Sequence, residues 1–124
     1  MMETMEQLTE VFDVGLALNS VGGEREFLTE VVGLIQAAWP TLMAEIRTGM
    51  ARGDLCTVEK TARLAKSAAR NVSAKRAYES ALQLEAVARK GDLQAVQSAS
   101  MDLEREVELL RFFLSALGND ECFP

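Results

Sequence analysis

The chain has 124 residues, of which 48% are apolar and 26% are charged, and its net charge is −6. This length and balance are typical of one folded domain with a single core, and they exclude a disordered chain. The acidic balance argues against a nucleic-acid-binding protein, whose surface is usually basic. We therefore expect a single domain over residues 1–124.

Location and metal chemistry are also limited by the sequence. We find no apolar run near the roughly 20 residues that cross a bilayer, and the start MMETMEQLTE lacks the features of a secretory signal. Cys56 and Cys122 lie far apart, and the chain contains no histidine, so no zinc-ligand spacing exists. We expect a cytoplasmic protein with reduced cysteines, no cofactor, no metal site and no membrane contact.

The first expected elements are a short helix over Phe12–Leu18, with Asp13 as its N-cap and Gly22-Gly23 after it, and a long helix over residues 24–52. Pro40 should kink the long helix without breaking it, because the apolar spacing continues in phase across the proline. Trp39, beside it, should be partly buried. The apolar stripe expected to face the core of the long helix comprises Phe27, Val31, Ile35, Ala38, Leu42 and Ile46.

Three more helices follow, separated by Gly53-Asp54, by the break at residues 71–73 and by Gly91-Asp92. Their expected core positions are Leu55, Val58, Ala62, Ala65, Ala69 and Val72; then Ala77, Ala81, Leu84 and Ala88; then Val96, Ala99, Leu103, Val107, Leu110, Phe113 or Leu114, and Leu117, before Gly118 ends the last helix. The pattern predicts an all-α, up-down-up-down four-helix bundle with a short extra N-terminal helix. Residues 1–11 and 118–124 should be loose ends.

Residues 61–74, TARLAKSAARNVSA, resemble the phosphoacceptor helix of histidine-phosphotransfer (HPt) domains, whose pattern is roughly A-H-x-L-K-G-S-A-x-N-x-G-A. Weaker fragments of the family pattern occur in the same order elsewhere. The matching positions are Ala62, Lys66, Ala69, Asn71, Val72 and Ala74 in this helix, and Asp13, Ala17, Leu18, Gly22–Glu24, Ala38, Pro40, Leu42, Met43, Met50–Asp54, Leu84-Glu85 and Ala88–Asp92 outside it. The resemblance implies a phosphorelay (two-component) signalling domain.

The departures from the family pattern gather at the acceptor. Arg63 stands at the position of the phosphorylated histidine, and Ser67 stands where the small glycine usually follows the lysine. Lys66 keeps the position of the lysine that helps to hold phosphoryl oxygens in active members. A guanidinium is protonated at physiological pH and has no free lone pair, so Arg63 cannot accept a phosphoryl group. We expect a pseudo-phosphotransfer module that has no catalytic residue and is not an enzyme.

Six basic residues and no acid lie between Lys60 and Arg76, on a chain whose net charge is negative. Such a stripe is suited to an acidic partner. With the resemblance, the expected partner is a response-regulator receiver domain or a sensor kinase. The expected partner-binding residues are Lys60, Arg63, Lys66, Ser67 and Arg70.

Two other functions remain open from the sequence. The first is a helical structural or oligomeric adaptor unrelated to phosphorelay, acting through Phe112–Leu117 or Trp39; an exposed phenylalanine there could support a homodimer. The second is a residual enzyme that uses another nucleophile, such as Cys56. A plain solvated basic face is the simplest alternative to the docking surface.

Overall fold

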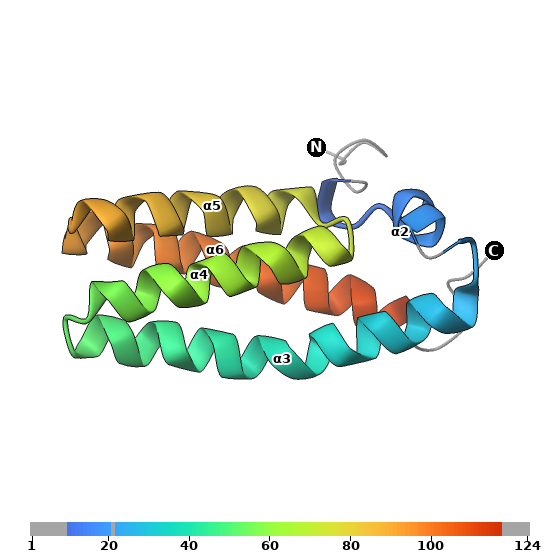
Figure 1. Ribbon diagram of the computed structural model, residues 1–124, viewed down its shortest axis with the longest axis horizontal. Coiled ribbons are helices and arrows are strands. Elements are labelled where there is room, and N and C mark those ends of the chain that lie inside the picture. Colours follow the sequence, from blue (N-terminus) through green and yellow to red (C-terminus); the bar gives the residue numbers. More distant parts are fainter. Residues whose placement is uncertain (1–9, 21, 118–124) are drawn as a thin grey trace.

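The structure, a computed structural model, describes residues 10–20 and 22–117. Its long helices α3 (Arg25–Ala51), α4 (Leu55–Asn71), α5 (Lys75–Lys90) and α6 (Leu93–Leu117) alternate in direction, and the short helix α2 (Val14–Ser20) lies at one end of the bundle (Figure 1). The predicted fold class is confirmed. Residues 1–9 and 118–124 of the predicted loose ends lie outside the described residues, whereas Val11 is buried and so belongs to the packed domain.

The predicted helix starts are confirmed by side-chain caps. An Oδ1 atom of Asp13, Asp54 and Asp92 accepts a hydrogen bond from the backbone N–H of the residue three positions later, at 2.9, 3.1 and 3.1 Å. Gly91 ends α5 in the left-handed conformation, with φ of 80°, which glycine adopts at little cost. These local signals set the helix lengths and therefore the antiparallel order.

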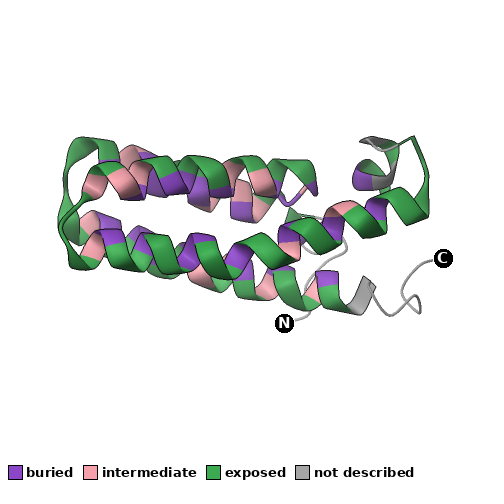
Figure 2. Ribbon diagram, turned by 60° about the horizontal axis from the view of Figure 1, so that its bottom comes forward, coloured by how far each residue is buried: buried purple, intermediate pink, exposed green. Residues whose placement is uncertain are grey.

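The interiors of α4, α5 and α6 follow the predicted phase. On α4, Ala62, Ala65 and Ala69 have no exposed surface, and their small side chains let the helix lie close to its neighbours. Figure 2 shows the buried positions turned toward the middle of the bundle on each long helix. On α6 the buried residue is Leu114 rather than Phe113. The predictions for the Leu117 side chain and for Gly118 fall outside the described part.

Helix α3 is continuous through Pro40, as predicted, but its predicted stripe is wrong in the N-terminal half. Phe27 is 54% exposed, whereas Leu28, Val32 and Trp39 are buried. The error arose because apolar residues occupy two faces of this helix, so that periodicity alone could not select the inner one. Ala38 is likewise exposed. Trp39 has no exposed surface, which corrects the prediction of partial burial and removes it as an interface anchor.

Because apolar residues occupy two of its faces, α3 is apolar enough, and with 27 residues also long enough, to cross a membrane. Its mean hydropathy is 1.3 over an 18-residue window. The prediction that no segment approaches the length and apolar character of a membrane-spanning helix is therefore wrong. Core helices of folded domains pass the same test, and α3 packs Leu28, Ile35 and Trp39 into the bundle. The absence of membrane contact stays a prediction.

Candidate functional site

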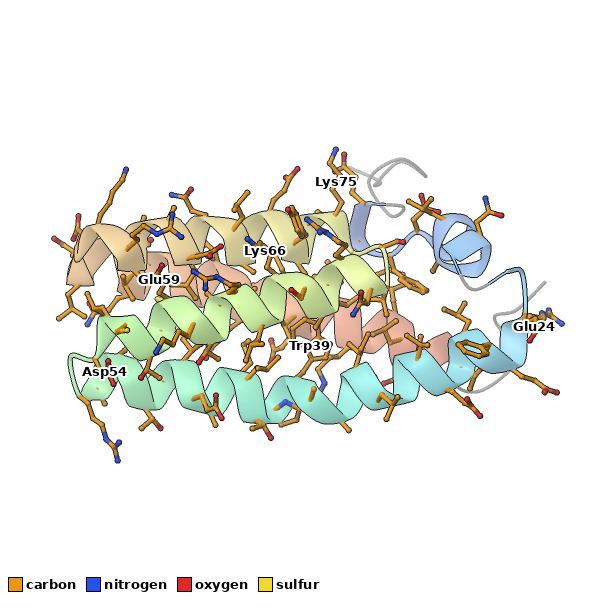
Figure 3. The ribbon with its side chains drawn as sticks, viewed as in Figure 1. Glu24, Trp39, Asp54, Glu59, Lys66 and Lys75 are labelled. Atoms are coloured by element: carbon orange, nitrogen blue, oxygen red, sulfur yellow. The ribbon has the colours of Figure 1, made fainter. Side chains whose placement is uncertain are left out.

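The candidate site is the outer side of α4 and its contact with α5. Arg63 follows the buried Ala62, and its side chain is 54% exposed, so it lies at the edge of the exposed face as predicted. Lys60, Ser67 and Arg70 are exposed on the same helix, whereas the Lys66 side chain is only 21% exposed. Figure 3 shows Lys66 between the α4 and α5 ribbons.

One buried carboxylate on α5 binds both cations. Arg63 donates from Nε to Oε2 of Glu85 at 2.9 Å, and Lys66 donates from Nζ to Oε1 of Glu85 at 2.8 Å. The Glu85 side chain is only 6% exposed. A buried carboxylate is costly unless it is paired and hydrogen-bonded, and here each oxygen has a charged donor. Arg63 is thus part of an ion-pair cluster that joins α4 to α5.

Two further residues extend this cluster. Glu59 accepts hydrogen bonds from Nη2 of Arg63 at 3.4 Å and from Nε of Arg89 at 3.0 Å, and Nη2 of Arg89 lies 3.4 Å from Oε2 of Glu85. The cluster of Glu59, Arg63, Lys66, Glu85 and Arg89 therefore holds three cations and two carboxylates, for a net charge of +1. Its carboxylates largely neutralise the cations near Arg63.

The pairing fixes the charge states at this site. Hydrogen bonds from Lys66, and then from Arg63, lower the pKa of Glu85, although burial opposes them. The hydrogen bond to Glu85 raises the pKa of Arg63 above its already high value. Arg63 is therefore held as a cation, with no lone pair to act as a nucleophile. The arrangement can present positive charge and N–H donors, but it cannot accept a phosphoryl group at this position.

The rest of the basic stripe is divided between faces. Arg70 donates from Nη2 to the Tyr78 hydroxyl at 2.9 Å and lies over its ring at 5.2 Å. Lys75 pairs with Glu10 at 3.9 Å, and Arg76 pairs with Glu106 of α6 at 3.0 Å. Counting charges along the sequence therefore overstated the positive potential. The prediction of one basic stripe from Lys60 to Arg76 is therefore wrong: the α4 cations share one side, whereas Lys75 and Arg76 of α5 pair with acids elsewhere.

Sequence reasoning missed Glu59, Glu85 and Arg89 of the ion-pair cluster, and also the exposed Leu64. Glu85 is four positions after the buried Ala81 and so lies on the inner side of α5. An acid at such a position could have been recognised as a counter-ion for the cations of α4. Leu64 is 58% exposed, between Lys60 and Ser67 on the outer face of α4. The available signal was an apolar residue outside the core-facing positions of a helix whose core-facing residues are small.

The comparisons agree with this architecture. No family model matches the chain, and no curated protein matches it in sequence. Among solved structures, the HPt domain of an Hpt sensor hybrid histidine kinase from Shewanella is similar, with a TM-score of 0.80 and 11% identity over 92% of this chain and 98% of that one. This likeness establishes the fold. The chain has the four-helix fold of a histidine-phosphotransfer domain.

Proposed function

We propose that this protein is a phosphorelay-type module that binds a response-regulator receiver domain without carrying a phosphoryl group. The observation that carries the proposal is Arg63, which takes the place of the acceptor histidine in the HPt-like helix and is tied to Glu85. The fold supports the phosphorelay class, and the sequence supports the loss of transfer, because none of the 124 residues is a histidine. A cytoplasmic location follows from the proposed partner.

Loss of transfer has a chemical reason. Relay through a side chain needs a neutral nitrogen that attacks phosphorus and then releases the group to an aspartate. The Arg63 guanidinium stays protonated, so it cannot form the intermediate. The same group is well suited to bind a carboxylate or an aspartyl phosphate, since its planar N–H donors can form charge-assisted bonds.

The geometry of Arg63 also favours binding. Its Nε and Nη2 atoms are bound to Glu85 and Glu59, while Nη1 has no hydrogen-bond partner in the described part of the chain. The side chain is therefore held in one orientation before a partner arrives, which lowers the entropy cost of binding. Leu64, the next residue along α4 and 58% exposed, supplies an apolar contact at the edge of the same face.

Titration of a receiver domain against designed variants tests the proposal. Reversing Arg63 or Lys66 would place a second carboxylate against the buried Glu85, so the informative changes are Lys60→Glu and Leu64→Glu, whose side chains are exposed. Matched controls are Lys90→Glu and Met101→Glu, the latter at a position 63% exposed. We expect the first pair, and not the controls, to weaken binding by about tenfold or more.

Salt gives a second measurement of the same complex. Exposed charges are screened over about 10 Å at 0.1 M salt, so the wild-type affinity should fall as salt rises. Equal affinity of wild type and Leu64→Glu would remove this face from the mechanism. Failure to bind any receiver or sensor kinase from the native cell would instead favour an adaptor unrelated to phosphorelay, with Phe112 as its exposed apolar contact.

A further inference from the structure

Helix α3 carries a second seam on the side that faces away from the bundle. Two residue series, each with a spacing of seven, are exposed along it: Phe27, Leu34, Thr41 and Thr48, and Glu30, Ala37, Ala44 and Ala51. Phe27 is 54% and Leu34 is 74% exposed. Alternating spacings of three and four over four heptads are the pattern of a helix that packs against another helix. No described helix of the chain covers this side.

The side chains of the seam are bulky at one end and small at the other. Its bulky residues, Phe27 and Leu34, lie in the N-terminal half, whereas Ala44, Thr48 and Ala51 occupy the C-terminal half. Two copies of α3 placed antiparallel, with Ala37 opposite Thr41, bring Leu34 opposite Ala44 and Phe27 opposite Ala51. Each bulky side chain then faces small ones, and a two-fold axis repeats the contact.

The surface beside the small residues is hollowed. A depression of ≈ 510 Å³ lies between α3 and α4, and its lining residues are Pro40, Thr41, Ala44, Glu45 and Thr48 of α3, Arg52 directly after α3, and Thr57 of α4. This is the level that Leu34 and Phe27 of the antiparallel copy reach. The chain therefore carries on one helix both a pair of protruding apolar groups and the hollow that would receive them.

The charge of Glu30 disfavours parallel packing of two α3 helices. Glu30 is an acid within the seam, and Arg52 lies beside its far end. Parallel packing would bury Glu30 against Glu30 of the other copy, which is unfavourable. Antiparallel packing places Glu30 opposite Thr48, whose hydroxyl can donate to it, and one turn from Arg52.

We propose that the occupant of this face is a second copy of the chain, in a two-fold dimer through antiparallel α3 helices. Arg63 is neither in the seam nor among the residues that line the hollow, so the dimer would display two copies of it. Sedimentation of the full chain from low to high micromolar concentration tests the proposal. We expect a monomer–dimer equilibrium, and Leu34→Glu should raise the dissociation constant by about tenfold or more. Phe112→Glu, at a position 70% exposed on α6, is the matched control and should leave it unchanged.

Two further variants keep the test independent of any folding defect. Glu30→Arg and Arg52→Glu should each weaken the dimer, and the double exchange should restore it. In a background with Cys56→Ser and Cys122→Ser, a mixture of Glu30→Cys and Thr48→Cys chains should form a disulfide-linked pair. Neither variant should do so alone, because residues 30 and 30 would be about 27 Å apart.

Three outcomes would overturn the proposal. A chain that stays monomeric at every concentration has no such interface, and self-linking by Glu30→Cys alone would indicate parallel packing. A monomer that floats with phosphatidylcholine vesicles, and loses this property in Leu34→Glu, would assign the seam to lipid.

Discussion

Arg63 and Glu85 form an unequal pair across the α4–α5 contact, with Nε of the arginine 2.9 Å from Oε2 of the glutamate. The arginine side chain is 54% exposed, and the glutamate side chain is 6% exposed. Removing the arginine leaves Glu85 bound by Lys66 and Arg89, whereas removing the glutamate leaves Lys66 without its carboxylate. The two residues should therefore contribute very differently to stability.

The first prediction concerns this inequality. Glu85→Ala should lower the free energy of unfolding by about 3 kcal/mol, because it leaves a mostly buried ammonium group without its partner. Arg63→Ala should cost clearly less, since its charge is solvated and Glu85 keeps two other donors. Urea denaturation of both variants measures the difference. A larger loss for Arg63→Ala would mean that the arginine, not the carboxylate, organises the cluster.

The second prediction concerns pH. The folded-state pKa of Glu85 lies below its ordinary value of 4.5, so its ion pairs stabilise the fold fully above that value and are lost as pH falls through the folded-state pKa. The stability gap between wild type and Glu85→Gln should be constant near neutral pH and should shrink in acid. Thermal unfolding across this range measures the gap. A gap that widens in acid would contradict the assigned sign.

The third prediction concerns the core. Leu84, Leu103 and Leu110 are at most 1% exposed. Each Leu→Ala change should cost about 2–5 kcal/mol, because it removes apolar contacts and leaves a cavity. The control is Phe112→Ala, which should change stability by less than about 0.5 kcal/mol in dilute protein. Chemical denaturation measures all four, and a tolerant Leu110 would place the α6 phase in error.

The fourth prediction compares two glycines of α3. A Cβ atom at Gly49 would lie 2.9 Å from Cγ2 of Val58 and 3.2 Å from the backbone oxygen of Asp54, whereas a Cβ at Gly33 would meet nothing within 4 Å. Gly49→Ala should cost about 1–3 kcal/mol by forcing α3 and α4 apart. Gly33→Ala should stabilise the helix by about 0.5–1 kcal/mol. Thermal unfolding measures both, and equal signs would refute the close α3–α4 approach.

The fifth prediction concerns chemistry. Incubated with a phosphorylated receiver domain, the wild-type chain should gain no acid-labile phosphoryl group, because it has no histidine. Arg63→His should gain label slowly, since an imidazole can accept the group but Ser67 keeps the site more crowded than glycine would. The control, Leu64→His on the exposed outer face, should stay unlabelled. Labelling of wild type at stoichiometric level would reject the loss of transfer.

The sequence predicted α4 and α6 well for a physical reason. On α4 the small residues Ala62, Ala65 and Ala69 lie on one side, and polar residues fill most of the other, so only one phase buries apolar surface. The aspartate caps at the helix starts were equally visible, because capping needs a particular residue at one position. Local chemistry was enough in these places.

Elsewhere the deciding information was not local. Phe27 and Leu28 are both suitable core residues, and only the position of the neighbouring helices makes the second one buried. The contact between Arg63 and Glu85 joins two helices, and its register depends on the lengths of both. For the same reason, the number of cations near Arg63 could be counted in advance, but their neutralisation by Glu85 on α5 could not.

Trp39 gives the molecule its own optical probe. It is the one tryptophan of the chain and has no exposed surface, so its emission should be at short wavelength in the folded state and shift to longer wavelength on unfolding. Figure 3 shows Trp39 directed from α3 toward the interior, whereas Leu34 on the same helix is 74% exposed. The fluorescence of Trp39 can therefore report whether the core stays folded when residues on the outer face of α3 are substituted.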